Sequence, residues 1–88
     1  MLPLLDELTL QAQSVLDDLW TKKLIPFQLR AHRVESLRPE VYAIRFHDSR
    51  LHSVDVSWKK EESFKDKVRV AVLAKVGRLT GPFKYTPN

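Results

Sequence analysis

The sequence contains no cysteine and only two glycines among its 88 residues. Without a thiol, the chain can form neither a disulfide framework nor a thiolate metal site. Gly77 and Gly81 both lie near the end of the chain, so a glycine-rich loop that cradles a phosphate after a strand is excluded. We therefore expect no cofactor, and we expect the cytoplasm as the location.

Long apolar runs are also absent. No stretch approaches the roughly 18 apolar residues that span a bilayer, and no basic residues precede the first apolar ones, as they do in a secretory signal. We therefore expect a soluble protein with no membrane partner. A chain of this length forms one small core. We expect a single domain over residues 1–79 and a C-terminal tail over residues 80–88.

Basic residues are missing from the first twenty positions. That segment carries four acidic residues and a net charge of −4, whereas residues 21–88 carry 15 basic and 7 acidic residues, a net charge of +8. A basic surface of this kind favours an anionic partner, although an ordinary solvated surface has the same composition.

The clearest pattern is an alternation of apolar and polar residues on either side of a polar turn at His47–Arg50. It predicts two antiparallel strands within residues 40–58. The apolar face of this hairpin carries Tyr42, Ile44, Phe46, Val54, Val56 and Trp58. Because an isolated hairpin is marginally stable in water, other parts of the chain must cover this face.

An amphipathic helix is predicted to begin near Pro3, and Asp18 and Lys22 are spaced to pair on it. Its apolar stripe contains Met1, Leu5, Leu8, Ala12, Val15 and Leu19. The stripe can pack on the chain's own sheet, or it can form a self-association surface through Leu5, Leu8, Val15 and Leu19. Both alternatives stay open from the sequence.

Residues 24–34 alternate again, so we expect a first strand there, with Pro26 near its beginning marking an edge strand. The polar segment of residues 34–39 is expected to be a connection. The segment of residues 68–76 fits either a fourth strand or a helical face. Because Ser63 and Asp66 resemble a helix-capping pair, we predict a helix over residues 64–78.

The expected fold class is α+β, with the order α-β-β-β-α: a two-layer structure in which both helices cover one face of a three-stranded antiparallel sheet. The other face is predicted to carry Gln28, Arg30, His32, Ala43, Arg45, His47, Ser53, Asp55 and Ser57. No aromatic residue is expected on this face, so it does not offer the platform on which single-stranded nucleic acids stack their bases.

Catalytic and metal-binding patterns are weak. Strand parity separates His47 from His52, so we do not expect three imidazoles to converge on a metal. The neighbouring residues His47, Asp48 and Ser49 do not make a hydrolase triad, because triads are assembled across a fold. We expect the protein not to be an enzyme.

The element order resembles that of double-stranded RNA-binding domains, and Ser57-Trp58-Lys59-Lys60 before the last helix is similar to the place where that family contacts phosphates. Residues 34–39 lack the glycine and histidine of the family's groove-contacting loop, and Glu61 and Glu62 place negative charge beside the lysines. The resemblance is therefore one of topology.

Two functions follow as hypotheses. The first is a non-catalytic module that binds the phosphates of RNA or DNA. Its predicted contacts are Lys59, Lys60, Lys65, Lys67 and Arg69, with Arg30 and Arg45 as a second patch. A solvated basic flank of the last helix is the alternative interpretation of these residues. The second hypothesis is a protein-interaction or accessory domain that homodimerises through the N-terminal helix.

Overall fold

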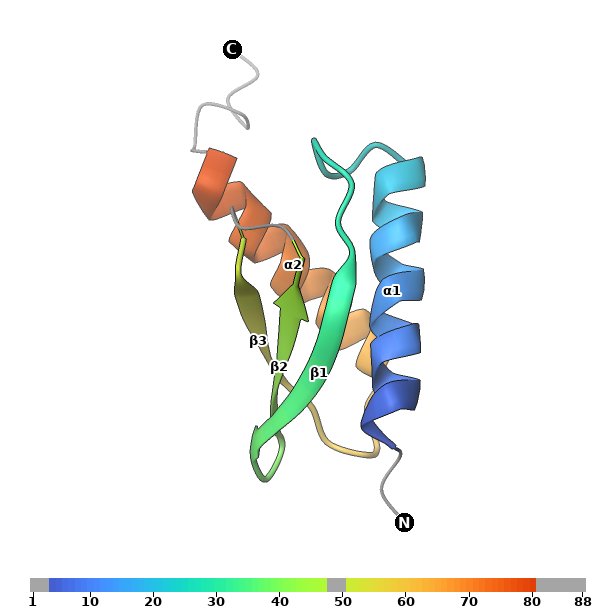
Figure 1. Ribbon diagram of the computed structural model, residues 1–88, viewed down its shortest axis with the longest axis vertical. Coiled ribbons are helices and arrows are strands. Elements are labelled where there is room, and N and C mark those ends of the chain that lie inside the picture. The colour runs from blue at the N-terminus through green and yellow to red at the C-terminus, as the bar shows by residue number, and fades with distance from the viewer. Residues whose placement is uncertain (1–3, 48–50, 81–88) are drawn as a thin grey trace.

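The computed structural model describes residues 4–47 and 51–80, with the side chains of residues 78–80 excepted. It contains two helices and three strands in the order α-β-β-β-α (Figure 1). The elements are α1 (Leu5–Thr21), β1 (Ala31–Arg38), β2 (Val41–Phe46), β3 (Ser53–Ser57) and α2 (Phe64–Thr80). The predicted fold class is confirmed.

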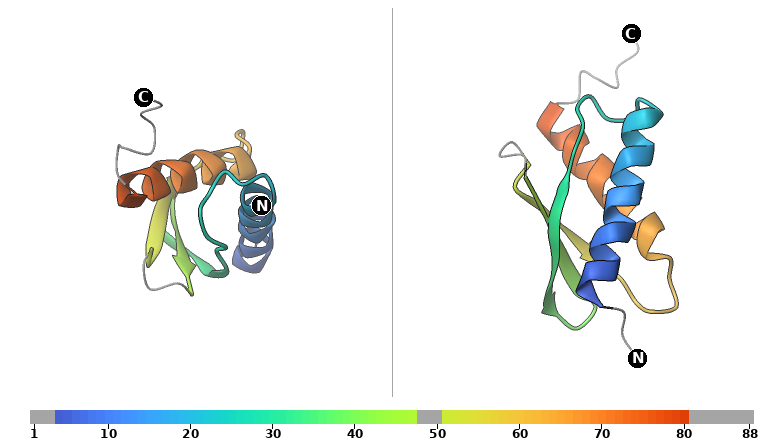
Figure 2. Two further views of the ribbon diagram at one scale, coloured as in Figure 1. Left: turned by 90° about the horizontal axis from the view of Figure 1, so that it is seen from above. Right: turned by 45° about the vertical axis from the view of Figure 1, so that its right-hand side comes forward.

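The three strands form one antiparallel sheet in the order β1-β2-β3. Figure 2 shows α2 crossing one face of this sheet and α1 lying beside β1. One continuous core fills the space between the helices and the sheet. Its fully buried large side chains include Leu8, Leu16, Leu19, Leu29, Ile44, Leu51, Val56, Val68 and Val72.

Helix α1 packs its apolar stripe onto the chain's own core. Leu8, Val15 and Leu19 are 1%, 2% and 0% exposed. The helix ends in a Schellman motif: the Leu24 N–H donates to the Leu19 carbonyl at 2.9 Å, and the Lys23 N–H donates to the Trp20 carbonyl at 3.0 Å. Lys23 occupies the left-handed position of this motif, with a φ of 61°. The predicted Asp18–Lys22 pair is present at 3.3 Å.

A first strand precedes the hairpin as predicted, but its predicted bounds, residues 24–34, were wrong. Residues 24–30 form an irregular connection, and β1 covers residues 31–38, including most of the segment that was expected to be a loop. Ile25 and Leu29 are nevertheless buried as their spacing suggested. The polar residues of β1 fit a strand because they face solvent, where Arg33 and Arg45 both pair with Glu35. A reversal at Pro39 and Glu40, whose φ is 66°, then leads into β2.

The hairpin of β2 and β3 is confirmed, with Ile44 opposite Val54 and Tyr42 opposite Val56. Residues 48–50 of its expected turn lie outside the described residues. Ala43 was expected on the exposed face but is only 2% exposed. It pairs with Glu35 on one side and Asp55 on the other, so it lies between two longer side chains on the same face of the sheet.

The ambiguous last segment is a helix, as predicted. Phe64, Val68, Val72 and Val76 are spaced by four and are all buried. The Ser63 hydroxyl accepts a hydrogen bond from the Asp66 N–H at 3.2 Å, which confirms the capping role of Ser63. No helix within the described part of the chain is long and apolar enough to cross a membrane.

Side chains of α1 bind the outer edge of β1. The Gln13 Oε1 atom accepts a hydrogen bond from the Ala31 N–H at 2.7 Å, and the Thr9 Oγ1 atom accepts one from the Val34 N–H at 3.0 Å. These two donors point away from β2 and would otherwise lie on an open sheet edge. The helix therefore covers this edge with polar side chains as well as with its apolar stripe.

Candidate functional site

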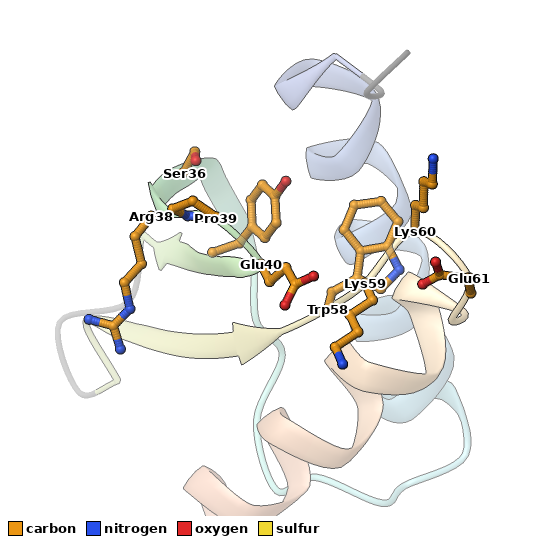
Figure 3. Close-up of a pocket in the computed structure, with 9 residues that line it drawn as sticks. Ser36, Arg38, Pro39, Glu40, Trp58, Lys59, Lys60 and Glu61 are labelled. Carbon is orange, nitrogen blue, oxygen red and sulfur yellow. The ribbon is translucent and has the colours of Figure 1, made fainter.

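A groove lies at one end of the sheet, where the β1–β2 turn meets the loop between β3 and α2 (Figure 3). Its volume is about 460 Å³. Ser36, Arg38, Pro39, Glu40, Tyr42, Trp58, Lys59, Lys60 and Glu61 line it. It combines two aromatic residues, three basic residues and two carboxylates in a small space.

The inner wall of the groove belongs to an aromatic cluster. The Trp58 ring lies 5.2 Å from the Phe64 ring and 5.7 Å from the Tyr42 ring, centroid to centroid, in edge-to-face arrangements. Trp58 and Tyr42 are each only 7% exposed. Their faces are used for packing, so the groove cannot offer them to a base as a stacking surface.

The loop from Trp58 to Ser63 is held by hydrogen bonds at both ends. The Trp58 N–H donates to the Glu40 carbonyl at 3.0 Å, and the indole Nε1–H donates to the Glu62 carbonyl at 2.7 Å. The Glu62 carboxylate accepts from the Lys59 N–H at 3.0 Å and pairs with Lys67 at 3.2 Å. The Lys59 N–H and the Lys67 ammonium lower the pKa of the Glu62 carboxyl, so this side chain is a carboxylate at neutral pH.

The rim of the groove is charged on both sides. Arg38, from the end of β1, lies on one side, and Lys59 and Lys60 from the loop lie on the other (Figure 3). Glu40 and Glu61 are the acidic lining residues, so three cations and two carboxylates give a net charge of +1. Arg38, Lys59 and Lys60 are all exposed.

The structure separates the other predicted contacts on α2 into free and paired residues. Lys65 is exposed in the first turn, close in sequence to the loop. Lys67 is bound to Glu62. Arg69 lies 3.4 Å from Asp18 on α1 and 3.4 Å from Asp66, so it links the two helices. Lys67 and Arg69 therefore already have carboxylate partners within the fold.

The predicted second patch does not join this groove. Arg30 precedes β1 and Arg45 lies near the end of β2, both at the other end of the sheet from the Pro39–Glu40 turn. The Arg45 guanidinium lies 3.0 Å from Glu35. This hydrogen bond from Arg45, together with the charge of Arg33, lowers the pKa of the Glu35 carboxyl. Arg45 thus serves a cross-strand ion pair.

Arg38 is a groove residue that the sequence interpretation missed. It pairs with Val41 in the β1–β2 ladder, and Val41 pairs with Ser57, the residue before Trp58. Arg38 was assigned to a connection because residues 34–39 are polar. Pro39 was the usable signal, since proline between two extended segments is typical of a tight turn.

The residues predicted to form an interaction surface on α1 are largely enclosed. Leu8, Val15 and Leu19 lie in the core, whereas Leu5 is 41% exposed. These three side chains are therefore not available to a second copy of the folded chain. Homodimerisation of the protein stays a prediction, and any α1 contact would use other residues of that helix.

Within residues 4–47 and 51–80, no three His, Asp or Glu side chains gather as metal ligands. The expectation that the protein is not an enzyme stays a prediction. Comparison of the chain with protein-family models, with curated proteins and with solved structures found no match.

Proposed function

We propose that this protein is a small non-catalytic module that contacts the phosphates of a nucleic acid through the groove at the end of the sheet. The observation that supports the proposal best is that Arg38, Lys59 and Lys60 line one groove, with Arg38 on one side and the lysines on the other; their charged ends point away from one another (Figure 3). Lys65 is exposed in the first turn of α2, and we include it among the proposed phosphate contacts.

The rigidity of the loop favours this role. Because hydrogen bonds from Trp58 and to Glu62 fix the backbone, Lys59 and Lys60 start from a defined position. Ordering them on a ligand then costs mainly side-chain entropy. Basic side chains on a fixed scaffold suit the regular charge spacing of a nucleic-acid backbone.

The contacts that we propose are to phosphate groups and not to bases. Trp58 and Tyr42 are packed edge to face and buried, so they do not supply base stacking. Phosphate contacts position a protein on a nucleic acid but do not read its sequence. We therefore expect binding that depends strongly on salt and weakly on sequence, to RNA or to DNA.

A titration at several salt concentrations tests this function. The double variant Lys59→Glu/Lys60→Glu should weaken binding of a short RNA or DNA duplex at least about tenfold and reduce the slope of log K against log salt by about 2. Fluorescence anisotropy with a labelled duplex, repeated with a second duplex of scrambled sequence, measures both quantities.

The matched control is Lys22→Glu/Lys23→Glu, which makes the same change in charge at the C-terminal end of α1. That end lies at the opposite end of the molecule from the Lys59–Lys60 loop (Figure 1). The exposed Lys22–Asp18 pair contributes little to stability, so the control should stay folded. An equal loss of affinity in both double variants would show that only net charge matters and would contradict the groove.

A second candidate function is a protein-interaction domain, because α1 leaves apolar side chains exposed. Leu4, before the helix, is 75% exposed and Leu10 is 72% exposed. Sedimentation velocity over a hundredfold range of concentration should then show a dimer that Leu10→Lys disrupts. A monomer throughout that range would rule out homodimerisation, so that this function would require a contact with a different protein.

A further inference from the structure

Two histidines meet at the end of the sheet opposite to the groove. His32 lies in β1 and His47 directly follows β2. The Nδ1 atom of His32 lies 3.3 Å from the Nε2 atom of His47, and the ring centroids are 4.6 Å apart with an angle of 77° between the rings. Both side chains are exposed.

An irregularity in β1 brings these rings together. Ala31 pairs with Phe46 and Arg33 pairs with Arg45, so the ladder skips His32 and leaves it as an extra residue. Such a β-bulge re-aims the side chain of the extra residue. Without the bulge, the side chain of His32 would simply alternate with those of Ala31 and Arg33 along the strand.

The backbone on both sides of the pair is fixed. The His47 N–H donates to the Arg30 carbonyl at 3.1 Å, one step beyond the Ala31–Phe46 pair. On the other side, Arg33 pairs with Arg45. The two imidazoles therefore project from neighbouring strands whose separation is set by the sheet, and only their side-chain torsions remain to be ordered on a ligand.

The separation of the two nitrogens matches a metal-ligand pair. At a Zn–N distance of about 2.0–2.1 Å and tetrahedral angles, two coordinating nitrogens lie roughly 3.3–3.4 Å apart. Coordination requires that the exposed rings rotate until both lone pairs point at one ion.

We infer that His32 and His47 form an exposed two-histidine site for a divalent transition-metal ion of the kind that imidazole prefers. The distance between the two nitrogens fits Zn²⁺. Within the residues that the structure describes, no third His, Asp or Glu completes a set of three. Water fills the remaining positions on the ion, so the site is open on the solvent side.

The charged neighbours lower the affinity of this site for a cation, because Arg33 and Arg45 flank the pair and Arg30 lies opposite His47, whereas Glu35 supplies one carboxylate. Arg33 and Arg45, which flank the pair on the ladder, both share the carboxylate of Glu35, at 2.6 Å and 3.0 Å. Their charges are thereby partly compensated.

Isothermal titration calorimetry with Zn²⁺ on the full chain, free of any polyhistidine tag, tests the site. His32→Ala and His47→Ala should each weaken Zn²⁺ binding at least about tenfold, and the double variant should be no weaker than either, because a single imidazole cannot chelate. The matched control is His52→Asn, since His52 is exposed with a φ of 59° and asparagine tolerates that conformation. It should leave the affinity within about twofold.

A second measurement identifies the coordinating atoms. Long-range ¹H–¹⁵N spectra of the imidazoles should show Zn²⁺-dependent shifts at Nδ1 of His32 and Nε2 of His47, with His52 unchanged. Unchanged affinity in either alanine variant, an equal loss in His52→Asn, or shifts at the other ring nitrogens would overturn the site. Both alanine variants change exposed side chains, and a native far-UV spectrum confirms that they remain folded.

Discussion

Trp58→Ala is expected to destabilise the folded chain by about 3–5 kcal/mol, the usual cost of truncating a buried aromatic residue. Trp58 is 7% exposed and packs edge to face with Tyr42 and Phe64. Its truncation also leaves the Glu62 carbonyl without the Nε1–H donor at 2.7 Å. In a domain of this size the loss corresponds to a fall in Tm of roughly 15–30 °C. Urea denaturation followed by far-UV circular dichroism measures it.

Trp58→Phe separates packing from hydrogen bonding in this cluster. Phenylalanine keeps most of the buried ring but loses the indole donor, so we expect a cost of about 1–2 kcal/mol. If alanine costs no more than phenylalanine, the aromatic contacts to Tyr42 and Phe64 contribute little. A cost below about 1 kcal/mol for Trp58→Ala would contradict the cluster as the anchor of the loop.

The double variant Thr9→Val/Gln13→Leu should cost about 2–4 kcal/mol, although both substitutions make α1 more apolar. Each removes an acceptor and leaves a part-buried backbone N–H of β1 unpaired, at Val34 and at Ala31. The two sites lie one helical turn apart, so the double variant and both single variants are needed to detect coupling. Chemical denaturation gives the free energies of unfolding.

Gln11→Leu/Ser14→Val is the control for this pair. It also replaces a polar residue by leucine and another by valine on α1. Gln11 is half-buried and Ser14 is exposed, and neither accepts a hydrogen bond from β1 in the described structure. A loss close to zero is expected for it. Equal losses in the two double variants would mean that added apolar surface, and not the missing acceptors, destabilises the fold. Hydrogen exchange at Ala31 and Val34 should quicken only in the first.

The sequence predicted those elements whose burial is strictly periodic. Val54 and Val56 alternate with exposed residues along β3, and the buried residues of β2 follow the same period apart from Ala43. The four-residue spacing from Phe64 to Val76 marks one face of α2. In these elements each buried side chain repeats at the period of its own backbone. Both the hairpin and the last helix could therefore be placed without knowledge of their neighbours.

β1 could not be placed in this way. Its register shifts between Ala31 and Arg33 and again between Ser36 and Arg38, so the period of two is interrupted twice in eight residues. Only Val34 is fully buried within it. The strand depends on pairing with β2 and on acceptors from α1, and both are tertiary contacts that a local pattern does not contain.

The residues of the candidate sites could be found only in part from the sequence, because some of them are brought together by tertiary contacts. Lys59 and Lys60 stand out because they precede a helix and adjoin Trp58, so charge and position suffice to find them. Arg38 joins them only through the register of β1 on β2. The His32–His47 contact depends on the bulge, which no alternation of polar and apolar residues indicates.

The hydrogen bonds from β1 to Gln13 and Thr9 make the two edges of the sheet unequal. β3 has no further strand beside it in the described part of the chain, whereas α1 occupies the corresponding position at β1. Main-chain pairing between molecules is therefore easier along β3 than along β1. Two copies that join along β3 would form one sheet whose outer edges are both β1, and each of these edges is already occupied by its own α1 at Ala31 and Val34.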